Sequence, residues 1–123
     1  YADLAEIYAA DGDYAPGTVV IFGGEKEITV TTERADTRVA GAISTAPAYL
    51  MNDSAEGLPV ALRGRIPVKV IGPVTKGDLL ITSAQAGYAE SAGNSGIDAL
   101  AVFAKAIESD FSAGEKIITA VIL

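Results

Sequence analysis

Short runs of aliphatic and β-branched residues recur along the whole chain, separated by Gly, Pro, Asn and Asp. Such punctuated runs are typical of the strands of an all-β domain. The runs that predict strands are 18–22, 27–32, 38–44, 59–71, 78–82, 99–107 and 116–123. The opening segment, 3–10, fits a helical stripe as well as a short strand, so its structure stays open.

Apolar and polar residues alternate in 27–32 and again in 65–70, which is the pattern of half-buried strands. In the second segment the buried side would carry Ile66, Val68 and Val70. The proline between them, Pro67, has no N–H to donate. We therefore expect this strand at a sheet edge, or paired only on the side away from the proline nitrogen.

One pattern begins three of the predicted strands: a Gly, a polar or charged residue, a variable position and two aliphatics, at Gly17, Gly77 and Gly114. The first two copies each lead to a second similar strand, 39–44 and 103–108. This indicates an internal duplication of a β-hairpin unit. The copies are too few for a propeller, so the sequence predicts a compact barrel or sandwich of duplicated β-hairpin units.

At 123 residues the chain has the length of one domain, and we expect a single β domain over 1–123. Half of its residues are hydrophobic but Trp is absent, so the core must consist mainly of Val, Ile, Leu and Ala. The net charge of −7 opposes binding to nucleic acid. No apolar run approaches the ~20 residues of a membrane-spanning helix, so we expect no membrane insertion.

The sequence contains neither His nor Cys. Catalytic triads with a His base, Cys nucleophiles and zinc sites with His ligands are therefore excluded. We expect no catalytic residue, no cofactor and no metal ligand, and hence no enzyme.

Two polar motifs match ligand sites only in part. Asp11 and Asp13 flank Gly12 like the start of a calcium loop, but the remaining oxygen ligands and the distal Glu are missing. The segment 23–26, Gly-Gly-Glu-Lys, lacks the spacing of a phosphate-binding loop. A solvated turn and a hairpin turn are the favoured interpretations.

Arg63, Arg65 and Lys69 lie in one predicted strand and could form a small anion site. A row of solvated charges on the outer face of a sheet explains them equally simply and also discourages pairing between sheet edges, so we favour it.

Tyr49, Leu50 and Met51 place three large apolar side chains in a predicted loop, 47–57. Aromatic residues and Met are enriched in interfaces, so these residues are candidates for contact with a neighbouring subunit. A loop folded over the core of its own domain is the alternative. A second loop, 89–96, is small and polar and is predicted to be the most mobile.

Several ordered segments carry a resemblance to a known group of proteins: YADLAEIY (1–8), YAPGTVVIFGG (14–24), RVAGAISTAP (38–47), AYLMN (48–52), GRIPVK (64–69), KGD (76–78) and KAIE (105–108). Together they resemble the C-terminal domain of tail-fibre-like structural proteins of marine T4-like phages, such as those infecting cyanobacteria. The resemblance implies the terminal module of a longer fibre-like protein, a homotrimer, an upstream fibre segment as partner, and location in the virion. A host surface receptor is a further partner that it suggests.

The opening is also similar to that of the autoproteolytic intramolecular chaperone domains of phage appendages, which are cleaved before a Ser-Ala-Asp-aromatic-Ala-Glu stretch. Ala2, Asp3, Ala5 and Glu6 match that stretch, but Tyr1 replaces its Ser. Cleavage by an acyl shift needs a hydroxyl or thiol close to the scissile bond, and the phenol of Tyr1 is too distant. Hydrolysis assisted by the two carboxylates is what would remain, as a single-turnover event.

The sequence therefore predicts a non-enzymatic virion structural or assembly module that promotes or caps a homotrimer of a phage tail fibre or appendage. One alternative is an autoproteolytic chaperone domain released by cleavage before Tyr1. Another is a subunit of an extracellular filament or of a layer that decorates a capsid.

Overall fold

The computed structural model describes residues 2–93 and 96–123, and it confirms the predicted all-β fold. The strands are β1 (Ala2–Tyr8), β2 (Val19–Phe22), β3 (Ile28–Val30), β4 (Val39–Ile43), β5 (Tyr49–Met51), β6 (Leu58–Ile71), β7 (Leu79–Thr82), β8 (Ala89–Ser91), β9 (Ala104–Ala106) and β10 (Glu115–Ile122). A short 3-10 turn, η1 (Ala99–Ala101), lies between β8 and β9. The ambiguous opening segment is thus a strand.

Three segments differ from their predictions. Of the predicted strand 99–107 only β9 is a strand, because Asp98 accepts a hydrogen bond from the Leu100 N–H at 2.9 Å and caps η1 instead. The predicted loop 47–57 contains β5. The predicted mobile loop 89–96 begins with β8, and its residues 94 and 95 lie outside the described residues.

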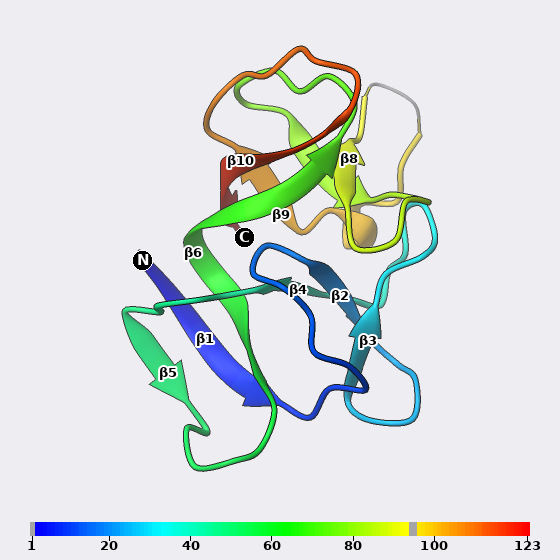
Figure 1. The fold of residues 1–123 in the computed structure, drawn as a ribbon. Coiled ribbons are helices and arrows are strands. Elements are labelled where there is room, and N and C mark those ends of the chain that lie inside the picture. The colour runs from blue at the N-terminus through cyan, green and yellow to red at the C-terminus, as the bar shows by residue number, and fades with distance from the viewer. Residues whose placement is uncertain (1, 94–95) are drawn as a thin grey trace.

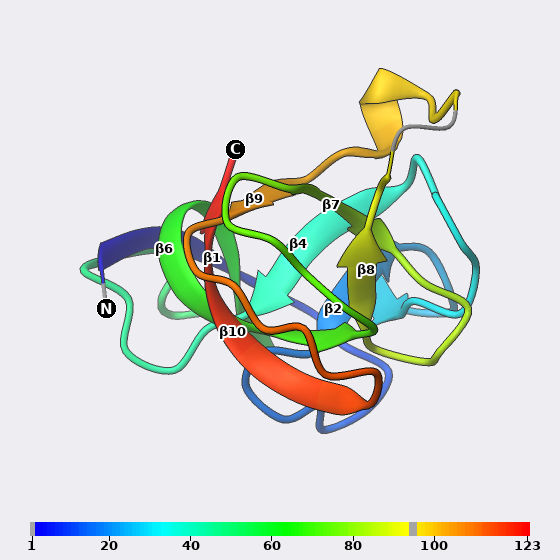
Figure 2. The ribbon, with the colours of Figure 1, turned by 90° about the horizontal axis from the view of Figure 1, so that it is seen from above.

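Strands from β6 onward form a closed barrel, which we call the second ring. β6 pairs with β10, β10 with β9, β9 with β7 and β7 with β8, all antiparallel. β8 then returns to β6 through a parallel pair, Val70 and Ala89. Figure 2 shows these five strands arranged around a common centre.

Earlier strands form a first ring in the same order. β1 pairs with β6, β6 with β4, β4 with β2 and β2 with β3, again all antiparallel. Closure is again parallel, through a bridge between Ala10 and Ile28. The N–H groups of Glu27 and Ile28 also donate to the Ala9 carbonyl, both at 3.0 Å. Each step has the direction of its counterpart in the second ring, so the predicted duplication is confirmed (Figure 1).

The turn before each repeated hairpin also matches in detail. The Gly17 N–H donates to the Ile43 carbonyl at 2.8 Å, and the Gly77 N–H donates to the Ala106 carbonyl at 2.8 Å. Both glycines have positive φ, 84° and 94°, which explains the residue type. Alignment of the two units by sequence would match Ile43 with Ile107. In the structure Ile43 instead corresponds to Ala106, so the second strands are offset by one residue from that alignment.

The third glycine motif is not a third copy of this turn. Gly114 precedes β10, and β10 occupies in the second ring the place that the beginning of β6 occupies in the first. Its likeness to the other two motifs is therefore one of sequence alone.

The long strand β6 belongs to both rings. Its residues 58–65 pair with β1 and its residues 64–71 pair with β10, so the two ladders meet at Gly64 and Arg65. Pro67 interrupts neither ladder. Lys69, two residues later, directs its N–H away from β10 and donates it to the Gly17 carbonyl at 3.0 Å. The nitrogens of residues two apart in a strand point the same way. This agrees with the expectation that the strand is paired on the side away from the proline nitrogen.

Each ring is filled by aliphatic side chains, as the composition predicted. Val20, Ile28, Ile43 and Val60 are buried in the first ring. The larger cluster in the second ring contains Ile66, Val68, Val70, Leu80, Phe103 and Ile118. Val19, Ala42 and Ala61 from the first ring belong to the same cluster and join the two cores.

Candidate functional site

The candidate interface residues form a short strand at the end of the first ring. β5 pairs with β1 in parallel, with Tyr49 beside Leu4 and Met51 beside Glu6, and it has no second neighbour among the described residues. The side chain of Tyr49 is 66% exposed, whereas Leu50 and Met51 are half-buried. β5 therefore presents a free strand edge with one large exposed aromatic side chain.

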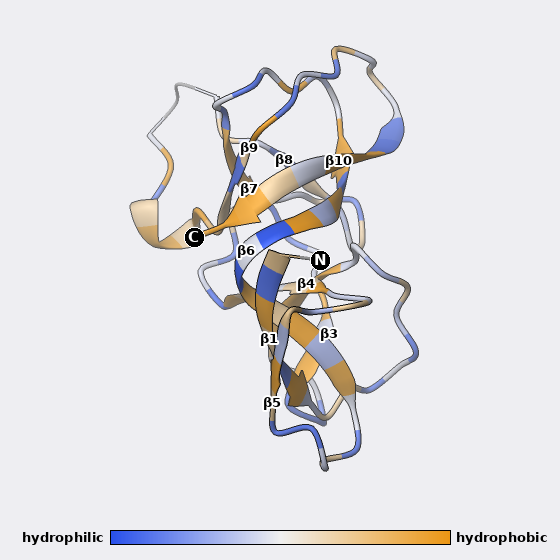
Figure 3. Cartoon of the chain, turned by 90° about the vertical axis from the view of Figure 1, so that its left-hand side faces the viewer, coloured by the Kyte–Doolittle hydropathy of each residue, from blue (hydrophilic) through white to orange (hydrophobic). Residues whose placement is uncertain are grey.

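Tyr49 shares its face with residues of two neighbouring strands. Leu4 lies between Tyr49 on β5 and Arg63 on β6, and residues directly paired in a sheet point to the same side. Figure 3 faces this side and shows the start of β1 next to a hydrophilic part of β6 beside the N-terminus, with β5 lower down along β1. The site thus combines an exposed tyrosine, an aliphatic side chain and an exposed arginine.

The three cations of the predicted row separate in the structure. Arg63 and Arg65 are exposed and have no ion pair among the described residues, whereas Lys69 is half-buried. The Lys69 ammonium lies 5.6 Å from the centre of the Tyr88 ring, in a cation–π contact. The two arginines alone could therefore meet an acidic partner from the β5 side.

Asp3, on β1, is a buried carboxylate close to this edge. Its Oδ2 accepts a hydrogen bond from the Ser44 hydroxyl at 2.8 Å, and its carbonyl accepts one from the Ala48 N–H at 3.0 Å. Its other carboxylate oxygen, Oδ1, is buried with no hydrogen-bond partner among the described residues. A buried acceptor without a partner is costly, so this position is chemically unusual.

The Glu6 side chain does not lie beside that of Asp3. Residues three apart in a strand point to opposite faces, and Glu6 instead accepts a hydrogen bond from the Tyr8 hydroxyl at 3.0 Å. The structure therefore does not bring the two carboxylates together on one face of β1. Tyr1 lies outside the described residues.

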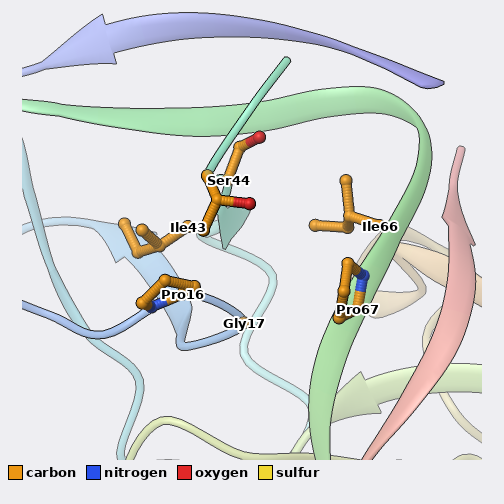
Figure 4. Close-up of a pocket in the computed structure, with 7 residues that line it drawn as sticks. Pro16, Gly17, Ile43, Ser44, Ile66 and Pro67 are labelled. Carbon is orange, nitrogen blue, oxygen red and sulfur yellow. The ribbon is translucent and has the colours of Figure 1, made fainter. Parts of the chain in front are cut away.

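A small pocket lies where the Gly17 turn meets β6 (Figure 4). It is lined by Pro16, Gly17, Ile43, Ser44, Thr45, Ile66 and Pro67, and its volume is about 60 Å³. That is room for a few water molecules but far less than the ~300 Å³ or more of typical small-molecule sites. Ser44 connects the pocket to Asp3, and the remaining walls are mainly apolar.

The turn that contains Asp11 and Asp13 is held by local hydrogen bonds. The Tyr14 hydroxyl donates to Asp11, and the hydroxyls of Tyr14 and then Thr29 hold the pKa of that carboxyl below its usual value. Asp13 is exposed. Within residues 2–93 and 96–123, no three acidic side chains lie close enough to hold a metal ion. Residues 23–26 form the hairpin turn between β2 and β3, as predicted.

The structure also brings together polar residues that the sequence did not single out. Asp36 is buried beside the second ring, where its N–H donates to the Thr82 hydroxyl at 2.7 Å. Arg38 donates to both oxygens of its carboxylate, at 3.1 and 2.9 Å. Arg34 pairs with Glu90 of β8 at 3.2 Å. No sequence motif marks the contacts of Asp36 with Thr82 and of Arg34 with Glu90, because each joins the two halves of the chain.

No protein-family model matches the chain, and no curated protein matches it significantly. No helix in the described part of the chain is long and apolar enough to cross a membrane.

Proposed function

We propose that the chain is a structural and assembly module of a phage tail fibre or appendage, and that it forms a homotrimer through the β1–β5 edge. The observation that carries this proposal is the free edge of β5, which presents Tyr49 beside Leu4 and Arg63. The resemblance of the sequence to tail-fibre-like C-terminal domains supplies the virion context, the upstream fibre segment and a host receptor as partners.

A free strand edge favours association for two reasons. Its unpaired N–H and C=O groups can pair with a strand of another chain, and its exposed aromatic group loses contact with water when it is covered. β5 is only three residues long, so pairing alone is weak and the side chains around it must contribute. The absence of a His or Cys in the sequence supports a role without catalysis.

The test is the solution mass of the purified domain, measured by light scattering over a dilution series. At the dilute end of the series a trimer of the 12.5 kDa chain is expected, and there Tyr49→Asp should shift it to the monomer by placing a charge in the contact. Phe111→Asp is the matched control, because Phe111 is equally exposed but lies in the loop before β10. A monomer at every concentration, or equal effects of the two substitutions, would overturn the proposal.

Self-cleavage is a second candidate function, and the burial of Asp3 favours it. A buried carboxylate with one unpartnered oxygen, on the third residue after the peptide bond that precedes Tyr1, could assist the addition of water to that bond. The precursor that carries this domain would then run as two fragments on a denaturing gel, and Asp3→Asn would leave it intact. Glu6→Gln is the control, because Glu6 faces the other way. An intact wild-type precursor would exclude this function.

A further inference from the structure

The duplication allows the surfaces of the two rings to be compared position by position. In the first ring, one side of the paired strands β2 and β4 is covered by the second ring. Lys69 of β6 donates its N–H to the Gly17 carbonyl at 3.0 Å, and the Val19 N–H donates to the Gly87 carbonyl at 2.9 Å. Val19 is fully buried as a result.

The equivalent positions of the second ring are open. An added Cβ at Gly17 would meet backbone atoms of Pro67 and Lys69 at 3.4 Å, whereas at Gly77 it would meet nothing within 4 Å. Leu79, the equivalent of Val19, is 42% exposed. The same N–H-to-carbonyl contact relates Thr31 to Val19 and Ala92 to Leu79, which confirms the equivalence.

More apolar surface surrounds Leu79. Leu79, Ala99 and Val102 line one hollow, and Leu100, next in the chain to Ala99, is 77% exposed. Figure 2 shows η1 standing out from the body of the molecule. We call Leu79, Leu100 and Val102, with the exposed Lys76 and Lys105, the tail face.

The parts of the second ring that cover the first ring have equivalent positions within the first ring itself. Thr82, at the end of β7, receives hydrogen bonds from the Ala35 and Asp36 N–H groups at 3.0 and 2.7 Å. Its counterpart at the end of β2 is Phe22, since the two residues occupy the same place in the repeated ladders. Phe22 is exposed and stacks edge-on against Tyr8, with the ring centres 5.1 Å apart.

The surface around Phe22 carries more carboxylates than cations, and its cations are Lys26 and Arg38. Glu25 and Glu27 lie on the hairpin after β2 and are exposed, as is Asp11 beside it. We call Tyr8 and Phe22, with these three carboxylates, the head face. Residues 1–64 contain ten acidic and four basic residues, whereas 65–123 contain six and five, so the head face lies in the acidic half of the chain.

We propose that the head face of one copy of this chain docks on the tail face of another, in the way that the second ring covers the first within the chain. Phe22 and Tyr8 then lie against Leu79 and Leu100, and Glu25 and Glu27 lie near Lys76 and Lys105. The two faces differ, so the contact is heterologous, and successive copies form either a closed ring or an open assembly with a free head and a free tail. This contact is separate from the β1–β5 edge and does not depend on it.

The test uses the full chain with Tyr49→Asp, which removes the proposed trimer contact, and measures its mass by sedimentation velocity over a concentration series. The mass should rise with concentration beyond the monomer. Phe22→Asp and Leu100→Asp should each weaken this association at least tenfold. Phe111→Asp, a change outside both faces, should leave it unchanged.

A mixture of the two variants gives the sharpest result. The Phe22→Asp chain keeps its tail and the Leu100→Asp chain keeps its head, so the equimolar mixture should form a dimer that grows no further. A mixture that stays monomeric, or a parent chain whose mass is independent of concentration, would overturn the proposal. Circular dichroism checks that each variant is folded, and Leu100→Ser, which adds no charge, should weaken association in the same direction.

Discussion

Asp36 shows how one polar residue can hold the junction between the rings. Its backbone N–H is bound by Thr82 of the second ring, and its buried carboxylate is held by Arg38 of its own ring. The hydrogen bonds from Arg38 keep the pKa of Asp36 below its usual value. The ionised form is therefore the one that the folded protein stabilises.

This arrangement predicts a specific pH dependence of stability. A carboxyl whose pKa is lowered by folding stabilises the protein above its unfolded pKa of about 4, and that stabilisation is lost as the pH falls through the lower folded pKa. Asp36→Asn should reduce the free energy of unfolding at pH 7 on the order of 1 kcal/mol, a modest figure because Arg38 is half exposed. In urea titrations the difference from wild type should narrow below pH 4. A difference that is constant from pH 7 to pH 2.5 would contradict this role.

Gly64 and Gly72 provide a matched test of close packing at glycine. Both have positive φ, 107° and 83°, so an Ala at either position is held in a strained backbone conformation. A Cβ at Gly64 would also lie 2.3 Å from the Ala2 carbonyl oxygen of β1, whereas at Gly72 it would meet nothing. Gly72→Ala should cost about 1 kcal/mol and Gly64→Ala about 3 kcal/mol or more, as measured by urea unfolding. Equal losses of unfolding free energy would show that β1 moves to make room for the added methyl group.

At the scale of single elements, β10 shows why alternation was a good guide. Its Ile118 is 2% exposed inside the second ring, while the adjacent Ile117 is 57% exposed. The same alternation was visible in β6, whose buried side chains are the ones that the sequence placed on one face. A strand that is buried on one side must follow this period, so these elements can be read from a single sequence.

Two substitutions in β10 test this difference. Ile118→Ala should reduce the free energy of unfolding by about 2–4 kcal/mol, because it leaves a cavity in a packed core. Ile117→Ala should change it by less than about 0.5–1 kcal/mol. The measurement is urea unfolding followed by circular dichroism, and a cost at Ile117 similar to that at Ile118 would mean that the outer face of β10 is covered in solution.

Short elements were less predictable because their structure depends on distant partners. β5 consists of three residues whose strand conformation comes from pairing with β1, more than forty residues earlier in the chain. η1 arises from a cap at Asp98 within a run that reads as a strand. Neither contains enough residues to show a period of its own. The free edge at Tyr49, on which the proposed trimer contact depends, was therefore located only by the structure.

At the scale of the whole molecule, the duplication was visible in the sequence but the closure of each ring was not. The repeated Gly motifs identified β2 and β7 as equivalents, yet the parallel returns through Ile28 and Ala89 have no sequence signal. The sequence also did not show that β6 is shared by the two rings, because a strand of 14 residues appears in it as one long run. The head and tail faces follow from that sharing, since it makes one ring cover the other.

The shared strand and the joined cores predict that the two rings unfold together. Val19, Ala42 and Ala61 of the first ring pack in the same cluster as the interior of the second, so opening one ring exposes apolar surface of the other. A single transition is expected by circular dichroism and by tyrosine fluorescence at the same urea concentration. Amide hydrogen exchange at Val20 and Leu80 should report the same free energy of opening. Two separate transitions would contradict the prediction.

The shared strand also has a consequence during synthesis on the ribosome. When the first half of β6 has emerged, the first ring can close, but the second half must wait for β10, more than forty residues later. At roughly 5–20 residues per second, Ile66, Val68 and Val70 stay without their final partner for several seconds. This interval is when the nascent chain is most exposed to aggregation or to capture by a chaperone, and Pro67, Arg65 and Lys69 in the same segment act against strand pairing with other chains.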